Sequence, residues 1–240
     1  MEKNNLLKIG SKEWIKIFQE SAIKMGISLD SNQMEKFCYF GNELLNWNKT
    51  HNLTSITDPI DVIAKHFLDS LVLSAYINSG KNQIEPNEDM QILDVGSGAG
   101  FPGIPLAILF PNTLFTLIDS SRKKVSFLKY TKACLNLNNI SVLNMRIEDL
   151  KYNKKYHNFF FMIISRAFLS INLFVPLVNT LVKDNGKIIA MKAEKAEQEL
   201  QKFSKKDFYN ISQKKYRLPL INQERIILCF NLKKQRVCQG

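Results

Sequence analysis

The sequence predicts an α/β fold, in which a mostly parallel sheet carries helices on both faces and is preceded by a helical extension. Three observations lead to this prediction. Helical apolar periodicity dominates the first third of the chain. After residue 89, strand-like apolar runs alternate with helical segments, which is typical of a parallel sheet with right-handed crossovers. One of these runs ends in a cluster of glycines. We therefore expect a helical extension over residues 1–88, packed on a main domain over residues 89–240.

Signals at helix ends predict the elements of the extension. Asp30 and Gln33 have the spacing of a capping box. Asp58 followed by Pro59 is typical of a helix start, and Gly26 is typical of a helix end. The expected elements are a helix over 11–25, a second helix from Asp30, a polar loop over 47–55, a third helix from Asp58 and a linker over 78–89.

The main domain is predicted to contain parallel strands followed by an antiparallel pair. The run at 159–164 is apolar throughout, as expected of a central parallel strand. The expected parallel strands lie near 91–95, 114–118, 140–145, 159–164 and 187–191. The expected helices lie near 103–110, 121–137, 170–183 and 194–206, and the antiparallel pair near 208–216 and 225–230. In such a sheet, ligands bind beyond the carboxyl ends of the parallel strands.

Composition and charge narrow the class of protein. The formal net charge is +11 and the pI is about 9.4, which favours a polyanionic partner such as RNA. No apolar run approaches the ~20 residues that cross a membrane, and the first residues lack the apolar core of a signal peptide. The four cysteines are far apart, and the three histidines show no metal-ligand spacing. We expect a cytoplasmic, monomeric, reduced protein without membrane contact and without metal.

The glycine-rich turn is the most informative stretch. Residues 92–95 end a strand, and Gly96, Gly98 and Gly100 follow at alternate positions. Such a corner between a strand and a helix is typical of nucleotide binding, because a ligand can approach the bare backbone. Asp119 ends the next strand, where its carboxylate can accept hydrogen bonds from both hydroxyls of a ribose.

Two registers of this turn imply different ligands. The run Gly98-x-Gly100-x-x-Gly103 matches the dinucleotide fingerprint and indicates an NAD-dependent oxidoreductase. The run Gly96-x-Gly98-x-Gly100, preceded by Asp94, resembles motif I of the class I S-adenosylmethionine-dependent methyltransferases. A carboxylate at this position would repel a pyrophosphate, but it suits a ligand that carries an ammonium and a sulfonium. The charge of Asp94 therefore favours S-adenosylmethionine.

Two other functions stay open at this point. Against the oxidoreductase, the chain shows no Tyr-x-x-x-Lys motif or other recognisable hydride-transfer constellation. A non-enzymatic RNA-binding protein would suit the basic charge, but it would leave the glycine turn and Asp119 unexplained.

The absence of certain motifs limits which atoms could accept a methyl group. The run Ser165-Arg166-Ala167-Phe168, after the fourth strand, differs from the Asn/Asp-Pro-Pro-Tyr/Phe run of exocyclic-amine methyltransferases. No Pro-Cys pair, as used to methylate carbon 5 of cytosine, occurs. A ring nitrogen with a free lone pair, such as N7 of guanine, needs neither device. Its methylation requires chiefly alignment of nucleophile and methyl group.

Several motifs occur in one order along the chain. They are 47–49 with 52–55, 65–70, 94–105, 117–120 with 123–128, 165–167 and 191–192. On these motifs the chain resembles the bacterial ribosomal RNA small subunit methyltransferase G family, also called glucose-inhibited division protein B, over roughly residues 30 to 192. The resemblance implies transfer of a methyl group from S-adenosylmethionine to N7 of a guanine in 16S ribosomal RNA, as RNA or within a small-subunit precursor. Departures from the family pattern are Lys65, Ser97, Ala193 and Ile226.

The resemblance and the strand-end rule together give the candidate site residues. The expected cofactor-binding residues are Asp94, Gly96, Gly98, Gly100, Phe101, Asp119, Ser120, Ile147, Glu148 and Arg166. The expected catalytic residues, acting by substrate positioning and electrostatics, are His66, Arg146, Arg166 and Lys192. The expected RNA contacts are Asn48, Asn52, Asp69, Lys123 and Lys124. Structural alternatives stay open: loop capping for Asn48, Asn52 and Thr54, and an i, i+3 pair for His66 and Asp69. His66 is not expected to act as a base, because N7 offers no proton to remove.

Overall fold

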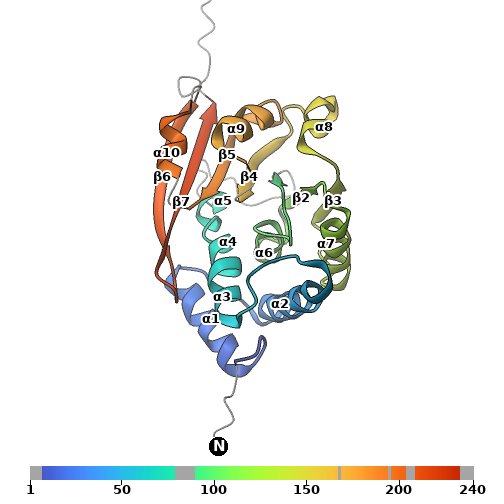
Figure 1. Cartoon of the computed structure of the whole chain (residues 1–240), viewed down its shortest axis with the longest axis vertical. Helices are drawn as coiled ribbons and strands as arrows, with labels where there is room; N and C mark the ends of the chain where they lie inside the picture. The colour runs from blue at the N-terminus through green and yellow to red at the C-terminus, as the bar shows by residue number, and fades with distance from the viewer. Residues whose placement is uncertain (1–6, 79–89, 167–168, 194–195, 204–208, 233–240) are drawn as a thin grey trace, which may run out of the picture.

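The computed structural model describes residues 7–78, 90–166, 169–193, 196–203 and 209–232. Within these ranges, seven strands form one sheet in the order β3-β2-β1-β4-β5-β7-β6 (Figure 1). The strands are β1 Gln91–Val95, β2 Leu114–Asp119, β3 Ile140–Asn144, β4 Phe160–Arg166, β5 Val182–Lys192, β6 Tyr209–Leu218 and β7 Gln223–Leu232. The predicted linker lies, beyond residue 78, outside the described residues.

The order of the strands creates a switch point at the centre of the sheet. β1 pairs in parallel with β2 on one side and with β4 on the other, and β5 continues beyond β4. The chain runs outward from β1 to β3 and then returns to β4, so a crevice is expected where the carboxyl ends of β1 and β4 diverge. β7 pairs antiparallel with β5, and β6 with β7, which confirms the predicted antiparallel pair.

Capping residues begin and end the helices as their sequence signals predict. The Asp30 side chain and the Gln33 side chain form a reciprocal capping box, Asp58 accepts from two N–H groups of the next turn, and Gly26 has a φ of 75°. The helices are α1 Lys12–Lys24, α2 Ser31–His51, α3 Pro59–Asp61, the π-helical η1 Val62–Leu68, α4 Asp69–Leu71, α5 Ser74–Asn78, α6 Gly103–Leu109, α7 Arg122–Cys134, α8 Ile147–Tyr152, the 3₁₀ turn η2 Lys154–Tyr156, α9 Ile171–Val178 and α10 Ala196–Gln201. None of these described helices combines the length and apolar character needed to cross a membrane.

The end of α2 differs from the prediction. The polar loop expected over 47–55 begins only at Asn52, because α2 extends that far. Trp47 packs its ring against Phe127 and Tyr130 of α7, with centroids 5.5 and 5.2 Å apart, so this part of the helix is held by aromatic contacts. Asn52 then ends the helix in the left-handed conformation, with a φ of 49°.

The boundary between α9 and β5 is also wrong in the prediction. The helix expected over 170–183 ends at Val178, and β5 begins before the expected strand. The Leu181 carbonyl oxygen accepts hydrogen bonds from the N–H groups of Phe159 and Phe160. The residues around Leu181 therefore pair with the start of β4 and do not continue the helix. The short helix α8, directly after β3, is an element that the sequence pattern does not predict.

The extension and the sheet share one hydrophobic core. Trp14, Phe18, Phe37, Phe40 and Phe67 are fully buried and pack ring against ring. The same cluster of buried residues includes side chains of β1, β2 and α6, and a second cluster includes those of α9, β5 and β7. The helices α1 to α4 therefore lie against the sheet and reach its carboxyl edge (Figure 1).

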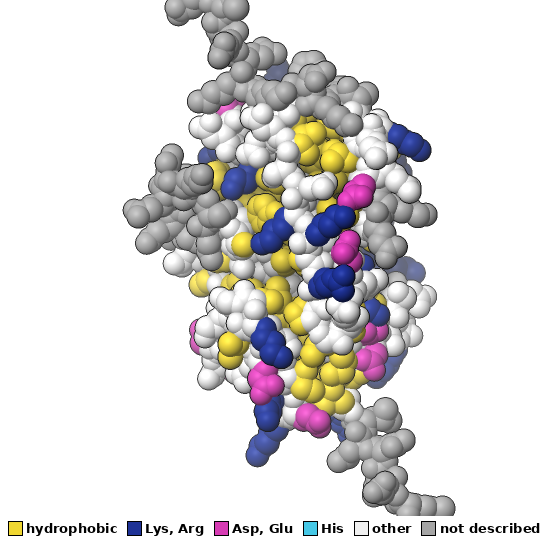
Figure 2. All heavy atoms as spheres, turned by 90° about the vertical axis from the view of Figure 1, so that its left-hand side faces the viewer, with side chains coloured by type: hydrophobic (Ala, Val, Ile, Leu, Met, Phe, Trp, Pro, Cys, Tyr) yellow, Lys and Arg dark blue, Asp and Glu magenta, His cyan; other side chains and the backbone are white. Residues whose placement is uncertain are grey.

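The β6 edge of the sheet is protected by charge. Figure 2 faces this side of the molecule, where basic side chains are interspersed with acidic ones. Lys215 of β6 pairs with Glu197 of α10 at 2.7 Å and lies 3.9 Å from Glu224 of β7. Charged edge residues disfavour the addition of a further strand to this side of the sheet.

Candidate active site

The turn after β1 takes a backbone conformation that requires glycine. Gly96, Gly98 and Gly100 have φ values of 70°, 58° and 95°, which residues with side chains rarely adopt. A Cβ at Gly100 would lie 2.4 Å from the Ile104 side chain, so this glycine serves close packing. A Cβ at Gly98 would meet only the carbonyl oxygen of Gly96, at 3.8 Å. Gly98 therefore leaves open space where a ligand can approach the backbone.

Asp94 holds a different position from the one expected of a cofactor-binding residue. Its side chain is fully buried, and Oδ2 accepts a hydrogen bond from the Gly103 N–H at 3.0 Å. Burial raises the pKa of this carboxyl to about 7. The side chain lines neither cavity of the site, so the expected contact with a cofactor ammonium is corrected. Asp94 instead ties the end of β1 to the start of α6 and thereby shapes the glycine turn.

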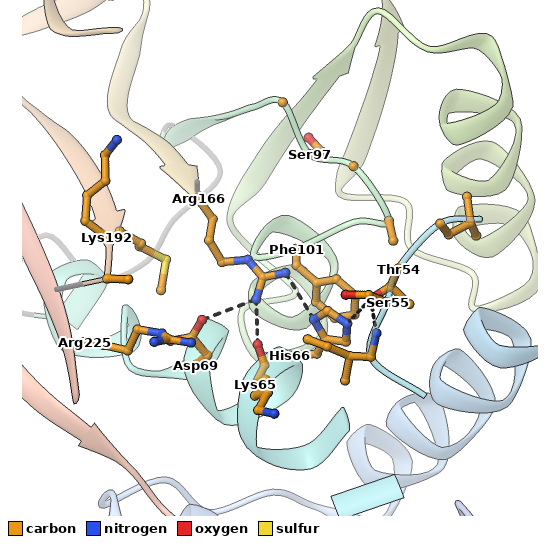
Figure 3. Close-up of a pocket in the computed structure, with 17 residues that line it drawn as sticks. Thr54, Ser55, Lys65, His66, Asp69, Ser97, Phe101, Arg166, Lys192 and Arg225 are labelled. Atoms are coloured by element: carbon orange, nitrogen blue, oxygen red, sulfur yellow. Dashed lines mark hydrogen bonds and ion pairs between the residues drawn. The ribbon is translucent and has the colours of Figure 1, made fainter. Parts of the chain in front are cut away.

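Two cavities lie at the carboxyl edge of the sheet, and Gly96 lines both. The main cavity has a volume of about 400 Å³ and the second cavity about 160 Å³. The main cavity receives Thr54, His66 and Asp69 from the extension, and Arg166, Lys192 and Arg225 from β4, β5 and β7 (Figure 3). The second cavity is lined by Asp119, Ser120, Arg146, Ile147 and Glu148. In the described ranges, no group of three or more His, Cys, Asp or Glu side chains is placed to hold a metal ion.

Arg166, the last residue of β4, holds the extension against the sheet (Figure 3). Its Nη1 donates to the Lys65 carbonyl oxygen at 2.7 Å and to Asp69 Oδ2 at 3.3 Å. Its Nη2 donates to His66 Nδ1 at 3.2 Å. The guanidinium also lies 5.1 Å from the centroid of the Phe101 ring. Because it is bonded in several directions at once, Arg166 provides a fixed charge rather than a mobile one.

His66 lies flat on Phe101 in the main cavity. The ring centroids are 4.2 Å apart and the planes are within 4° of parallel. Burial, together with the charges of Arg166 and Lys65, holds the pKa of the imidazole well below its usual value, so the ring is neutral. An arginine only donates, so Nδ1 is the acceptor and Nε2 carries the proton. That proton is donated to Thr54 Oγ1 at 2.9 Å.

Asp69 joins three parts of the fold. Its Oδ2 pairs with Arg166 of β4, and its Oδ1 accepts a hydrogen bond from the Tyr216 hydroxyl of β6 at 2.7 Å. Arg166 bridges Asp69 and His66, in place of the direct pair left open by the sequence. Asp69 is only 4% exposed and lines the main cavity as a buried ion-pair partner, and its expected contact with RNA stays a prediction. Tyr216 is a site residue that sequence reasoning misses.

Lys192 and Arg225 are two further cations of the main cavity. Lys192 Nζ donates to the Leu169 carbonyl oxygen and pairs with Glu199 Oε2 at 3.1 Å, so a carboxylate balances its charge. Arg225 donates only to neutral oxygens of its own strand, of which the Gln223 side-chain oxygen is at 3.0 Å. Among the residues with described positions, no carboxylate forms an ion pair with Arg225. Arg225 is the second site residue that sequence reasoning misses.

The second cavity gathers most of the other expected cofactor residues. Asp119 Oδ2 accepts a hydrogen bond from the Gly98 N–H at 3.0 Å, and Oδ1 accepts one from the N–H two residues further on, at 2.8 Å. Ser120 lines the same cavity. Ile147 is buried at its wall, whereas Glu148 is exposed at its opening. A carboxylate, an apolar wall and a second carboxylate therefore lie around one cavity.

The structure separates Arg146 from the other expected catalytic residues. Arg146 is exposed, precedes the first turn of α8 and lines the second cavity. His66, Arg166 and Lys192 line the main cavity. The expected catalytic residues therefore fall into two groups, because β3 and β4 are not neighbours in the sheet.

The expected RNA contacts of α2 and α7 line neither cavity. Asn48 Oδ1 accepts a hydrogen bond from the Thr54 N–H at 2.9 Å, and Asn52 ends α2. These positions agree with the alternative in which both asparagines shape the loop. Lys123 and Lys124 lie in the first turn of α7, where Lys123 is exposed.

The fold and the site define a class of protein. The strand order, the glycine turn after β1 and the carboxylate at the end of β2 are those of the Rossmann-like S-adenosylmethionine-dependent methyltransferases. A SAM-dependent methyltransferase from Aquifex aeolicus is similar in structure, with a TM-score of 0.55 and 16% sequence identity over 78% of this chain and 97% of that chain. At this identity the likeness shows the fold alone.

Sequence comparison narrows the class to one family. The family model described as rRNA small subunit methyltransferase G matches residues 33–227. The ribosomal RNA small subunit methyltransferase G of Syntrophus aciditrophicus is 39% identical over 190 residues, which are 79% of this chain and 76% of that protein. The protein of the same name from Mycoplasma capricolum is 44% identical over 179 residues, 75% of this chain and 70% of that protein. The chain belongs to the rRNA small subunit methyltransferase G family of S-adenosylmethionine-dependent enzymes, which confirms the resemblance seen in its motifs.

Proposed function

We propose that this protein transfers the methyl group of S-adenosylmethionine to N7 of a guanine in 16S ribosomal RNA. The observation that carries the proposal is the pair of cavities that meet at Gly96. The second cavity has the residues that suit the adenosine half of the cofactor. The main cavity has the cations and the rigid aromatic wall that suit a nucleotide of the substrate.

The residues of the second cavity fit an adenosine. The two carboxylate oxygens of Asp119 each accept one backbone N–H, and each retains a lone pair for a ribose hydroxyl. Ile147 offers apolar surface for the adenine ring, and Glu148 offers an acceptor for its exocyclic amine. The open space at Gly98 permits the rest of the cofactor to pass close to the backbone.

The main cavity suits attack by a ring nitrogen that loses no proton. When bound, S-adenosylmethionine supplies an electrophilic methyl group. Both ring nitrogens of the neutral His66 are already bonded within the protein, so His66 is a positioning residue and not a base. The stacked pair of His66 and Phe101, fixed by Arg166, holds the base in line and excludes water.

Arg225 is the proposed contact for a phosphate of the RNA. The charges of Arg166 and Lys192 are balanced by Asp69 and Glu199. Arg225 lines the same cavity, and its hydrogen bonds to the described residues go to neutral oxygens. A guanidinium with spare donors suits a phosphate in one or two hydrogen bonds.

The division of the chain at residues 88 and 89 also belongs to this proposal. The extension supplies Thr54, His66 and Asp69 to the substrate side, and the main domain supplies the cofactor side. The main domain also supplies Arg166, Lys192 and Arg225 to the substrate side, so both parts would contact the RNA and the main domain alone would bind the cofactor.

The dinucleotide alternative finds no support in the turn. In its register, the Ile104 side chain fills the space at Gly100, and the Gly103 N–H is already bonded to Asp94. Neither glycine is then open to a pyrophosphate.

Transfer of a labelled methyl group from S-adenosylmethionine to unmodified small-subunit RNA tests the proposal, with the products identified by nucleoside mass spectrometry. Free 16S RNA and assembled small subunits are compared as substrates. We expect 7-methylguanosine. A different methylated nucleoside would contradict the acceptor atom and the argument against a base. Absence of transfer to both substrates would contradict the function itself.

A further inference from the structure

The hydrogen bonds around Thr54 have a fixed direction. Arg166 Nη2 donates to His66 Nδ1, which leaves the ring proton on Nε2. Nε2 therefore donates to Thr54 Oγ1, and the hydroxyl does not donate to the imidazole (Figure 3). The chain of donors starts at an arginine, which cannot accept, so its direction cannot reverse.

The Thr54 hydroxyl has no accepting capacity left. Its Oγ1 accepts the His66 proton at 2.9 Å and the Ile56 N–H at 3.0 Å, which occupies both lone pairs. The backbone N–H of Thr54 is bonded to Asn48, so the residue is held in place from a second side. Within the described part of the chain, the hydroxyl proton has no acceptor in hydrogen-bonding reach, and Thr54 lines the main cavity. The hydroxyl is thus a donor that is free for a ligand in the main cavity.

A donor that cannot accept distinguishes the two purines. Beside N7, guanine presents the acceptor O6, whereas adenine presents the donor N6–H₂. Donation to O6 orients guanine and leaves the N7 lone pair free. The amino group of adenine would face a hydroxyl that has no lone pair for it.

We propose that Thr54 is a specificity-determining residue, whose hydroxyl donates a hydrogen bond to O6 of the target guanine. The proposal rests on the proposed function, since it requires guanine in the main cavity. His66 and Arg166 act on specificity through Thr54, because they fix the direction of its proton.

The test uses the full-length protein and ligated 16S RNA in which the target guanosine is replaced by inosine or by 2-aminopurine riboside. Inosine keeps O6 and lacks the 2-amino group, whereas 2-aminopurine lacks O6. We expect kcat/KM of the wild type to fall about 10- to 100-fold with 2-aminopurine and to change little with inosine. Equal rates on guanosine and 2-aminopurine would overturn the proposal without any variant.

The variant Thr54→Val is tested on the same RNAs, so that the loss of the hydroxyl can be compared with the loss of O6. It removes the hydroxyl and leaves two N–H groups unpaired, so it slows the reaction on every substrate. Comparison within the variant cancels that common loss. We expect its guanosine-to-2-aminopurine ratio to fall to about one, and Thr54→Ser to retain the wild-type ratio. A Thr54→Val protein that keeps the full ratio, or that loses only affinity for S-adenosylmethionine in calorimetry, would overturn the proposal. If the wild type methylates no guanine, the proposed function fails instead.

Discussion

The two cavities share Gly96 but hold their charges differently. In the main cavity, Arg166 and Asp69 pair with each other, and their side chains are only 19% and 6% exposed. In the second cavity, Arg146 and Glu148 are exposed to solvent. The paired charges of Arg166 and Asp69 belong to the fold, whereas those of Arg146 and Glu148 are available to a ligand. A substitution of Arg166 or Asp69 should therefore affect stability and catalysis together, and one in the second cavity should affect mainly cofactor affinity.

The largest effect is expected from Arg166→Met. The substitution leaves the buried carboxylate of Asp69 without its cation, so we expect the free energy of unfolding to fall by about 2–4 kcal/mol. This is below the value for a fully buried pair because the Arg166 side chain is 19% exposed. Loss of the fixed positive charge should lower kcat/KM about 100- to 1,000-fold. Urea unfolding and the methyl-transfer assay measure the two effects.

The double variant Arg166→Met/Asp69→Asn is the control for this prediction. It removes both charges, so part of the lost stability should return while activity stays low. An Arg166→Met protein as stable as the wild type would show that the pair is not part of the fold.

Asp119→Asn should act on the other cavity. It keeps one acceptor for the Gly98 N–H but loses the charge that holds the ribose, so we expect affinity for S-adenosylmethionine to fall about 10- to 100-fold. The free energy of unfolding should fall by no more than about 1.5 kcal/mol. Calorimetric titration measures the affinity. Asp149→Asn is the matched control, since Asp149 is an exposed carboxylate of α8 that lines neither cavity. Equal affinities in all three proteins would remove Asp119 from the cofactor site.

Arg225→Gln should affect only RNA binding. Loss of one phosphate contact should weaken RNA binding about tenfold and make the slope of log affinity against log salt shallower by about 0.7–0.9. Cofactor affinity and stability should not change, because Arg225 has no carboxylate partner among the described residues. Arg217→Gln, an exposed arginine of the same hairpin that bonds to Asn222, should leave the slope unchanged. Identical slopes for both variants would contradict the assignment of Arg225.

The smallest effect is expected from acidification. The pKa of His66 is held well below 6.5 by burial and nearby cations, so the folded imidazole is neutral at pH 7 and should contribute no limb to the pH profile of kcat/KM around neutral pH. Below pH 6.5 the unfolded chain binds this proton and the folded chain does not, so stability should fall as the pH falls. His66→Gln should remove that dependence from the unfolding curves. A kinetic limb near pH 6.5 that disappears in His66→Gln would contradict the neutral imidazole.

The sequence predicts the fold well where one segment carries its own signal. The apolar run that becomes β4, the capping box at Asp30 and the glycine turn each depend on local residues, and the structure confirms them. The separation of Arg146 from Arg166 depends on strand order, which no local pattern contains. Arg146 follows β3 and Arg166 ends β4, but β2 and β1 lie between those two strands.

The contributions of the last hairpin could not be predicted for a related reason. Tyr216 meets Asp69 across a separation of 147 residues, and its partner is decided by the register of β6 against β7. Side chains alternate between the two faces of a strand, so a shift by one residue would turn Tyr216 away from Asp69 and Arg225 away from the cavity. The family motifs seen in the sequence also stop before this hairpin. The direction of the Asp94 side chain was also not predictable from local residues. Its spacing to Gly96 is the expected one, but the side chain points into the protein and bonds to the Gly103 N–H.

The hydrogen bond between Asp69 and Tyr216 also bears on the order in which the parts of the site are formed during synthesis. Synthesis proceeds from the N-terminus, and the extension, the glycine turn and β1 to β5 are all made before β6. A growing chain that has folded as far as β5 has the cofactor cavity, but Asp69 still lacks one of its two partners, and Arg225 does not yet exist. The main cavity is therefore completed last, when the final hairpin brings Tyr216 to Asp69 and Arg225 to the cavity wall.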